Sequence, residues 1–127
     1  MRPDIVVLLG NLDLKKSAFA FLKDSERETI ERNIADDKSI GMIFKNAADE
    51  VLFYAVIDIE KDAVHIHAAA GSFPRHYKIL TGATEVLACK LNKKRVTFTT
   101  KIKAVKELGR RAGYVLNSFG DMEKAIC

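Results

Sequence analysis

The stretch EVLFYAVIDIE, residues 50–60, constrains the fold of this chain more than any other. It is rich in β-branched and aromatic residues, which is typical of a long strand. Residues 61–62 then form a tight turn, and AVHIHAAA (63–70) continues as a second strand antiparallel to the first. After Gly71 the apolar residues recur at helical spacing, which predicts a helix over 77–91. The centre of the chain is therefore a hairpin whose second strand leads through a loop into a helix.

Two short helices are expected before this hairpin, within 13–36. Asp13 is an N-cap candidate for the first, and Ser25 with Glu28 forms a capping box for the second. The segment 3–9 fits either a short helix or an edge strand.

Further strands are expected at 40–44, 94–100 and 114–119. A helix at 102–112 would be capped by Thr99 or Thr100 and ended by Gly113, with only a short tail after the last strand. The resulting order is three antiparallel strands followed by a β-α-β-α-β unit. It predicts an α+β domain (α/β in a looser scheme) built on a mixed sheet covered by helices.

At 127 residues, with 48% hydrophobic and 30% charged residues, the sequence predicts one globular domain spanning 1–127. No apolar run approaches the roughly 20 residues that cross a bilayer, so we expect no membrane partner and a cytoplasmic location. Cys89 and Cys127 lack the spacing of metal ligands, and reduced thiols are the simplest interpretation. Cys89 is expected to pack as a small apolar residue inside its helix.

Basic residues are concentrated late in the chain, although the net charge is only +4. Between 92 and 111 one acid, Glu107, is accompanied by Lys93, Lys94, Arg95, Lys101, Lys103, Lys106, Arg110 and Arg111. Such a segment could meet nucleic acid, a phosphorylated cofactor or an acidic protein, or form a solvated face. Phe98 is the one aromatic residue within it, which argues against stacking with single-stranded nucleic acid.

The order of elements from about residue 13 to 119 resembles the GNAT N-acetyltransferase superfamily, with that fold's first strand absent or reduced to residues 4–9. The best local match is VKELGRRAGYVL (105–116), which resembles the family's penultimate helix and last strand. Arg111, Gly113 and Tyr114 hold the basic, glycine and aromatic positions of that pattern. The resemblance implies a GNAT-like fold, with acetyl-CoA bound where the fourth and fifth strands, HIHAAAG and RVTFTTK, separate.

The resemblance also implies that the pyrophosphate of acetyl-CoA lies at the loop and helix start after the fourth strand, here 71–78. A helix start offers unpaired amides and a partial positive charge to an anion. The candidate cofactor-binding residues are Ala69, Gly71, Arg75, His76 and Lys78.

The chain departs from the family at several of these positions. The family's loop pattern, Gln or Arg, two residues, Gly, one residue, then Gly or Ala, is not met in SFPRHYKILTGA (72–83). Tyr77 and Ile79 are bulky where the backbone would approach phosphate. Gly109 falls where the family often places a tyrosine general acid, and Ile102 where it often has asparagine.

Residues on and before the predicted fourth strand are candidates for a catalytic base. His65 and His67, spaced i, i+2, project from the same face of the strand, and Glu60 or Asp58 is a candidate by analogy with the family's carboxylates. Each also has a structural interpretation, as a partly buried histidine or an acid at a strand end. No metal site is predicted, because the third ligand would be His76, in a loop–helix turn.

The leading hypothesis from the sequence is a GNAT-fold protein that acts in binding or assembly without conventional acetyl transfer. Its size and its SFPRHYK loop resemble small bacteriophage GNAT-like proteins with a degenerate acetyl-CoA loop. That resemblance implies a virion or head-assembly component, located in the host cytoplasm or the virion, with a phage or host protein as partner.

Two alternatives stay open. The first is an acetyl-CoA-dependent N-acyltransferase, an enzyme with an unusual pyrophosphate loop in which Arg75 and Lys78 compensate for the missing glycines. The second, weaker alternative is nucleic-acid contact through the basic 93–111 segment. The acceptor substrate and the oligomeric state are not indicated by the sequence.

Overall fold

The computed structural model describes residues 6–10 and 23–126, with the backbone alone for 6–10. Within them, one seven-stranded sheet has the order β1-β2-β3-β4-β5-β7-β6. The β4–β5 pair is parallel, and the other neighbouring strands are antiparallel. The sheet is therefore mixed, and the predicted α+β class is confirmed.

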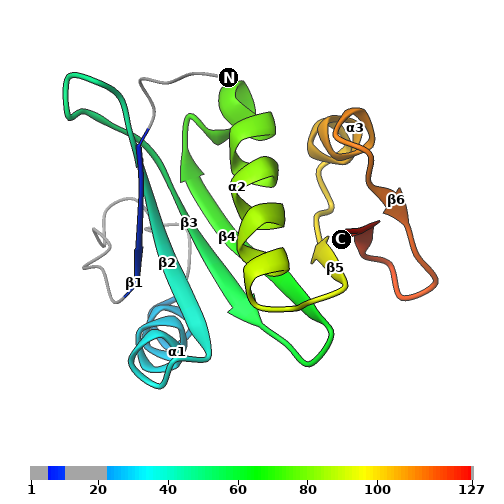
Figure 1. Ribbon diagram of the computed structural model, residues 1–127, viewed down its shortest axis with the longest axis horizontal. Coiled ribbons are helices and arrows are strands. Elements are labelled where there is room, and N and C mark those ends of the chain that lie inside the picture. Colours follow the sequence, from blue (N-terminus) through cyan, green and yellow to red (C-terminus); the bar gives the residue numbers. More distant parts are fainter. Residues whose placement is uncertain (1–5, 11–22, 127) are drawn as a thin grey trace.

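The elements follow the predicted order through the centre of the chain (Figure 1). They are β1 (Val6–Gly10), α1 (Asp24–Ala35), β2 (Ser39–Lys45), β3 (Val51–Ile59), β4 (Ala63–Gly71), the 3-10 helix η2 (Phe73–His76), α2 (Tyr77–Lys90), β5 (Arg95–Phe98), α3 (Lys103–Arg111), β6 (Val115–Leu116) and β7 (Met122–Ala125).

The N-terminal predictions are confirmed in part. Of the two possibilities for 3–9, the edge strand is correct, since β1 lies at one end of the sheet. The capping box is wrong: Lys23 is the N-cap of α1, and Ser25 lies inside the helix, where its carbonyl accepts a hydrogen bond from Thr29. Asp24 in the first turn favours the N-terminus electrostatically instead. The helix predicted from Asp13 lies outside the described residues.

The C-terminal part differs more from the prediction. Helix α3 ends as expected, because Gly113 adopts a φ of 96° and the amide of Tyr114 donates to the carbonyl of Gly109. The predicted strand over 114–119 shrinks to the two residues of β6, however, and the expected short tail contains β7, which pairs with β5. The sequence MEKA has a single large apolar residue, Met122, so its periodicity is too weak to reveal a strand.

The two faces of the sheet are covered by different helices because β3 is buried on both sides. Phe53, Ala55 and Ile57 belong to the core beneath α2, whereas Tyr54 and Val56 pack with α1. Figure 1 shows α2 and α3 side by side on one face of the sheet. Helix α3 packs there against the C-terminal strands, so the space between α2 and α3 lies over β4 and β5.

Cys89 does not have the expected environment. Its side chain is exposed, and it is disulfide-bonded, so a reduced thiol packed as a small apolar residue is wrong for this position. Cys127 lies outside the described residues. None of the helices between residues 23 and 126 combines the length and apolar character needed to cross a bilayer.

Candidate functional site

The parallel strands β4 and β5 separate part-way along their length, and a pocket opens between them. Their pairing runs from Ala63–Arg95 to Ile66–Phe98, where β5 ends, whereas β4 continues to Gly71. The pocket holds about 690 Å³ of empty space, part of it open to solvent. Its walls come from β4, the first turns of α2, the end of β5 and the inner side of α3. It lies between the two strands at which the resemblance placed a cofactor.

The interior of this pocket is mostly apolar, and several of its hydroxyl groups already have partners within the protein. Thr81 Oγ donates to the carbonyl of Tyr77 at 3.0 Å, and Thr99 Oγ donates to Asp121. Thr100 Oγ accepts from the amide of Ile102 at 3.1 Å, one residue before α3, and so does not cap the helix as predicted. The remaining polar side chains of the lining are those of His67 and Tyr77.

His67 lies in the pocket lining at a shift in the β3–β4 register. Val56 pairs with Ala68 and Ile57 with Ile66, which leaves His67 without a partner on β3. Its Nδ1 lies 2.6 Å from Asp58 Oδ2. Because a carboxylate only accepts, Nδ1 carries the proton in the neutral ring and Nε2 is the basic nitrogen. Ser39 Oγ donates to the other oxygen of Asp58 at 2.7 Å.

This arrangement shifts both groups of the pair. The hydrogen bond to Asp58 raises the pKa of His67 above its usual 6.5, although burial opposes the shift. Burial would raise the pKa of Asp58, but the hydrogen bonds from His67 and Ser39 outweigh it and lower that pKa below 3.8. His67 is therefore an oriented imidazole that holds its proton more firmly than a free histidine.

The other candidate bases lie outside the pocket lining. His65 pairs with Asp58 across the sheet and so shares the face of the His67 ring, as the i, i+2 spacing predicted. Its Nδ1 lies 2.7 Å from Thr97 Oγ, however, and it does not line the pocket. Glu60 is exposed in the β3–β4 turn, and its amide donates to the carbonyl of Ala63. Of Glu60, His65 and His67, the structure brings only His67 to the pocket.

Backbone donors of the loop after β4 already form hydrogen bonds within the protein, to β3 and within the loop itself. Ser72 donates twice to the carbonyl of Leu52, from its amide at 3.0 Å and its hydroxyl at 2.8 Å. The amide of Arg75 donates to Ser72, and Pro74 has no amide hydrogen. A Cβ on Gly71 would lie 2.8 Å from the backbone oxygen of Leu52. Glycine is therefore required at this position by the close approach of strand β3. Three amide positions of this loop, at 72, 74 and 75, are thus unavailable to a phosphate.

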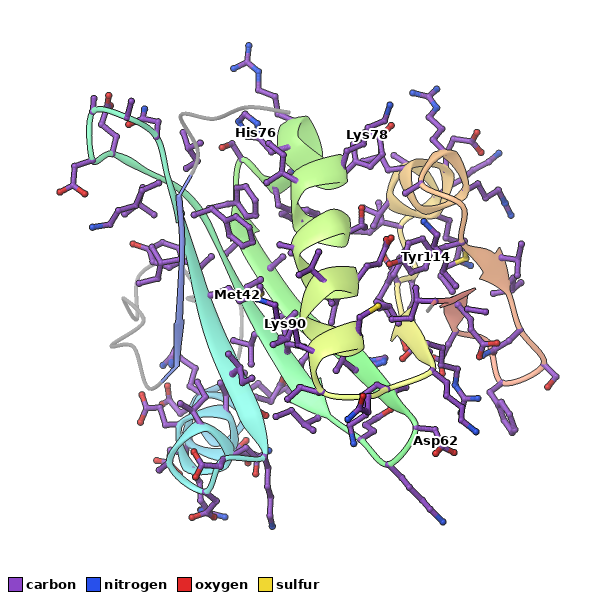
Figure 2. The ribbon with its side chains drawn as sticks, in the orientation of Figure 1. Met42, Asp62, His76, Lys78, Lys90 and Tyr114 are labelled. Carbon is purple, nitrogen blue, oxygen red and sulfur yellow. The ribbon has the colours of Figure 1, made fainter. Side chains whose placement is uncertain are left out.

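Four of the predicted cofactor-binding residues lie outside the pocket lining: Gly71, Arg75, His76 and Lys78. Ala69 lines the pocket, whereas the ring of His76 stacks on Phe53, with centroids 5.9 Å apart. Figure 2 shows His76 and Lys78 on opposite sides of the first turn of α2, with Lys78 on the side of α3. Arg75 and Lys78 are exposed, and neither forms an ion pair within the described part of the chain.

The basic segment lies partly beside the mouth of this pocket. Lys101 and Lys103 flank Ile102, a pocket residue that is 61% exposed. These two lysines have no ion pair with any described residue, whereas Arg95 pairs with Glu123 and Arg110 with Glu107. Phe98 is buried, so it offers no surface for base stacking. Nucleic-acid contact through this segment stays a prediction.

Helix α3, one wall of the pocket, is fixed to α2 by a polar cluster at its C-terminal end. Tyr114 is buried and donates to Glu85 Oε2 at 3.1 Å. Lys124 donates to Glu85 Oε1 at 3.0 Å and to the carbonyl of Ala112 at 3.1 Å. Burial and the charge of Glu85 raise the pKa of Tyr114, so its hydroxyl stays protonated and acts as a donor. Figure 2 shows Tyr114 at the junction between α2 and the C-terminal elements.

Among residues 6–10 and 23–126, no three His, Cys, Asp or Glu side chains are grouped as metal ligands. The carboxylate–histidine pair beside the pocket is that of Asp58 and His67. Sequence reasoning considered each residue as a base but missed that they form a pair. The hairpin register sets Asp58 opposite His65, whereas the contact of Asp58 with His67 is a side-chain contact along the strand, and the register shift at His67 has no signal in the local sequence.

Comparison with known proteins supports the fold. No family model and no curated protein matches the sequence significantly. Among solved structures, a protein from Klebsiella pneumoniae named for acyl-CoA N-acyltransferase activity has a TM-score of 0.73 at 17% identity, over 97% of this chain and 98% of its own. A Bacillus subtilis acetyltransferase in complex with CoA has a TM-score of 0.70 at 15% identity, over 90% of this chain and 78% of its own. The spermidine N-acetyltransferase of Vibrio cholerae has a TM-score of 0.69 at 10% identity, over 96% of this chain and 94% of its own.

These likenesses show that the chain has the GNAT fold, as the order of its elements suggested. At such low identity they show the fold alone. None of the three is described as a bacteriophage or virion protein, so the assembly hypothesis gains no support from them.

Proposed function

We propose that this protein is an N-acyltransferase that takes its acyl group from an acyl-CoA thioester bound between β4 and β5. The observation that carries the proposal is the Asp58–His67 pair at the edge of an apolar pocket formed by the separation of those strands. The structural neighbours, one of them a CoA complex, support the same class of reaction. This choice favours the acyltransferase alternative over the assembly hypothesis.

The pocket fits the pantetheine arm of such a donor better than its phosphates. No described strand pairs with β4 beyond Ile66 on the β5 side, so backbone groups there are available to an extended amide chain. Ala68 and Ala69 leave room beside that stretch of backbone. The phosphates would meet Arg75 and Lys78 of the α2 start and Lys101 and Lys103 of the α3 start instead of a glycine-rich loop.

His67 would act as the general base on the acceptor amine. Bound acyl-CoA supplies an electrophilic thioester carbonyl; the amine nitrogen forms the new C–N bond and the C–S bond breaks. His67 Nε2 takes the proton that the amine loses, and Asp58 stabilises the resulting imidazolium through Nδ1. Since Gly109 cannot donate a proton, the departing thiolate would receive one from water or from the His67 imidazolium.

Two measurements on the whole protein test this proposal. Calorimetry with acetyl-CoA and CoA should show micromolar binding, and release of free CoA thiol should be stimulated by an amine such as spermidine, the substrate named for one structural neighbour. The His67→Gln variant should keep its affinity for CoA but lose about 10²- to 10⁴-fold in turnover, as expected for loss of a general base. Absence of any CoA binding by the folded wild-type protein would refute the proposal.

A matched control variant distinguishes the loss of a general base from general damage to the fold. Lys90 is an exposed residue at the other end of α2 (Figure 2), and Lys90→Gln should leave both binding and turnover unchanged. Because only neutral His67 can accept a proton, wild-type turnover should rise with pH through a pKa above 6.5. A rate that did not change between about pH 6 and about pH 8.5 would exclude His67 as the base.

A further inference from the structure

Four apolar side chains line the pocket around the point where β4 and β5 meet, which we call its closed end. Ile66 and Phe98 are the last pair of β4 and β5, so they mark the point where the strands begin to separate. Leu80 of α2 and Leu108 of α3 line the same pocket from its two sides. A polar group at this end would lose water without gaining a hydrogen-bond partner, which disfavours it there.

Gly109 determines where the ring of Phe98 lies. It is buried in the interior of α3, a position where glycine is disfavoured relative to alanine. A Cβ at this position would lie 2.6 Å from Phe98 Cζ and 3.2 Å from Cε1. The glycine therefore lets the aromatic ring lie directly against the helix backbone. With any larger residue, the ring or the helix must move, and both are walls of the pocket.

We infer that this closed end receives the acyl group of the donor, that it prefers acyl chains longer than acetyl, and that Gly109 with Phe98 sets their length. The inference rests on the proposed function. An acetyl group would place a single methyl at this end, where Phe98 and Leu80 are already buried while Ile66 and Leu108 still present partly exposed apolar surface. Each added methylene buries more of it, which is favourable without any polar partner.

The test uses calorimetry with acetyl-, propionyl-, butyryl- and hexanoyl-CoA, so that no acceptor is needed. We expect the affinity to rise about fourfold per added methylene until the closed end is filled, corresponding to about 0.8 kcal/mol for each. If acetyl-CoA binds as tightly as butyryl-CoA or more tightly, the inference is wrong and the proposed function still stands. If none of the four thioesters binds, the proposed function itself fails.

Two glycine variants test whether Gly109 sets the preferred length of the acyl chain. In Gly109→Ala the ring of Phe98 or helix α3 must move, so the ratio of butyryl-CoA to acetyl-CoA affinity should differ from that of the wild type. Gly82→Ala is the matched control, since a Cβ on Gly82, also in a helix, meets nothing within 4 Å, and its ratio should equal that of the wild type. An unchanged ratio in folded Gly109→Ala would refute the role of this glycine.

Leu108→Ala keeps the test informative if Gly109→Ala does not fold. Removing this side chain enlarges the pocket from the α3 side, so the preferred chain should lengthen from that of the wild type toward hexanoyl-CoA. Circular dichroism confirms that each variant is folded before binding is measured. A chain-length profile identical to that of the wild type would show that the acyl group lies elsewhere.

Discussion

Replacing Asp58 with asparagine should destabilise the protein in a pH-dependent way. The carboxylate accepts hydrogen bonds from both His67 and Ser39, and the pair it forms with His67 is charged while the imidazole is protonated. Asparagine can still accept from Ser39, so the main loss is the charge-assisted bond to His67. Such bonds are worth about 1.5–3 kcal/mol when buried. The His67 side chain is 34% exposed, and discounting for solvent screening leaves about 1–2 kcal/mol.

The sign of the pH dependence follows from the pKa of His67, which is higher in the folded protein than in the unfolded chain. The extra stability from the charged pair is therefore fully present below about pH 6.5, the unfolded value, and is lost as pH rises through the folded pKa. We expect Asp58→Asn to lower the free energy of unfolding by about 1–2 kcal/mol at pH 6 and by less at pH 9.

Urea denaturation followed by circular dichroism at both pH values measures this difference. Asp62→Asn is the control, because Asp62 lies at the tip of the β3–β4 hairpin, away from His67, and its side chain is exposed (Figure 2). The control should change stability by less than about 0.5 kcal/mol at either pH. An equal loss of stability for Asp58→Asn at the two pH values would refute the reasoning, because the neutral imidazole keeps only its Nδ1–H bond to the carboxylate and lacks the positive charge of the ion pair.

Two further predictions concern the walls and the mouth of the pocket. Glu85→Ala should lower the free energy of unfolding by about 2 kcal/mol, because it leaves the buried hydroxyl of Tyr114 without its acceptor; thermal unfolding checks this, and Val86→Ala, at an exposed neighbour, should show almost no change. Arg75→Ala and Lys78→Ala should each weaken CoA binding by about two- to fivefold at low salt, and by less at high salt, since exposed charges are screened. If neither variant weakens binding at low salt, these cations do not hold the phosphates.

The regular elements around the site could be predicted because their signals are local. The long β-branched run at 50–60, the alternation at 63–70 and the helical spacing after Gly71 each specify an element within a short window. Their order was enough to indicate a GNAT-like mixed sheet, which the structure confirms. Strand β7 could not be predicted in the same way, because its four residues carry too little apolar pattern and it is held by its pairing with β5 and β6.

The site itself depends on contacts between residues that are distant in sequence. The sequence alone determined that two histidines lie on the strand before the loop and that the glycines of an ordinary phosphate loop are missing. Only the tertiary structure decided that His67 pairs with Asp58, and that Gly109 approaches Phe98 closely enough to shape the pocket. The physical reason is that periodicity records which face of an element is buried, whereas strand register and close approach are settled by packing between elements.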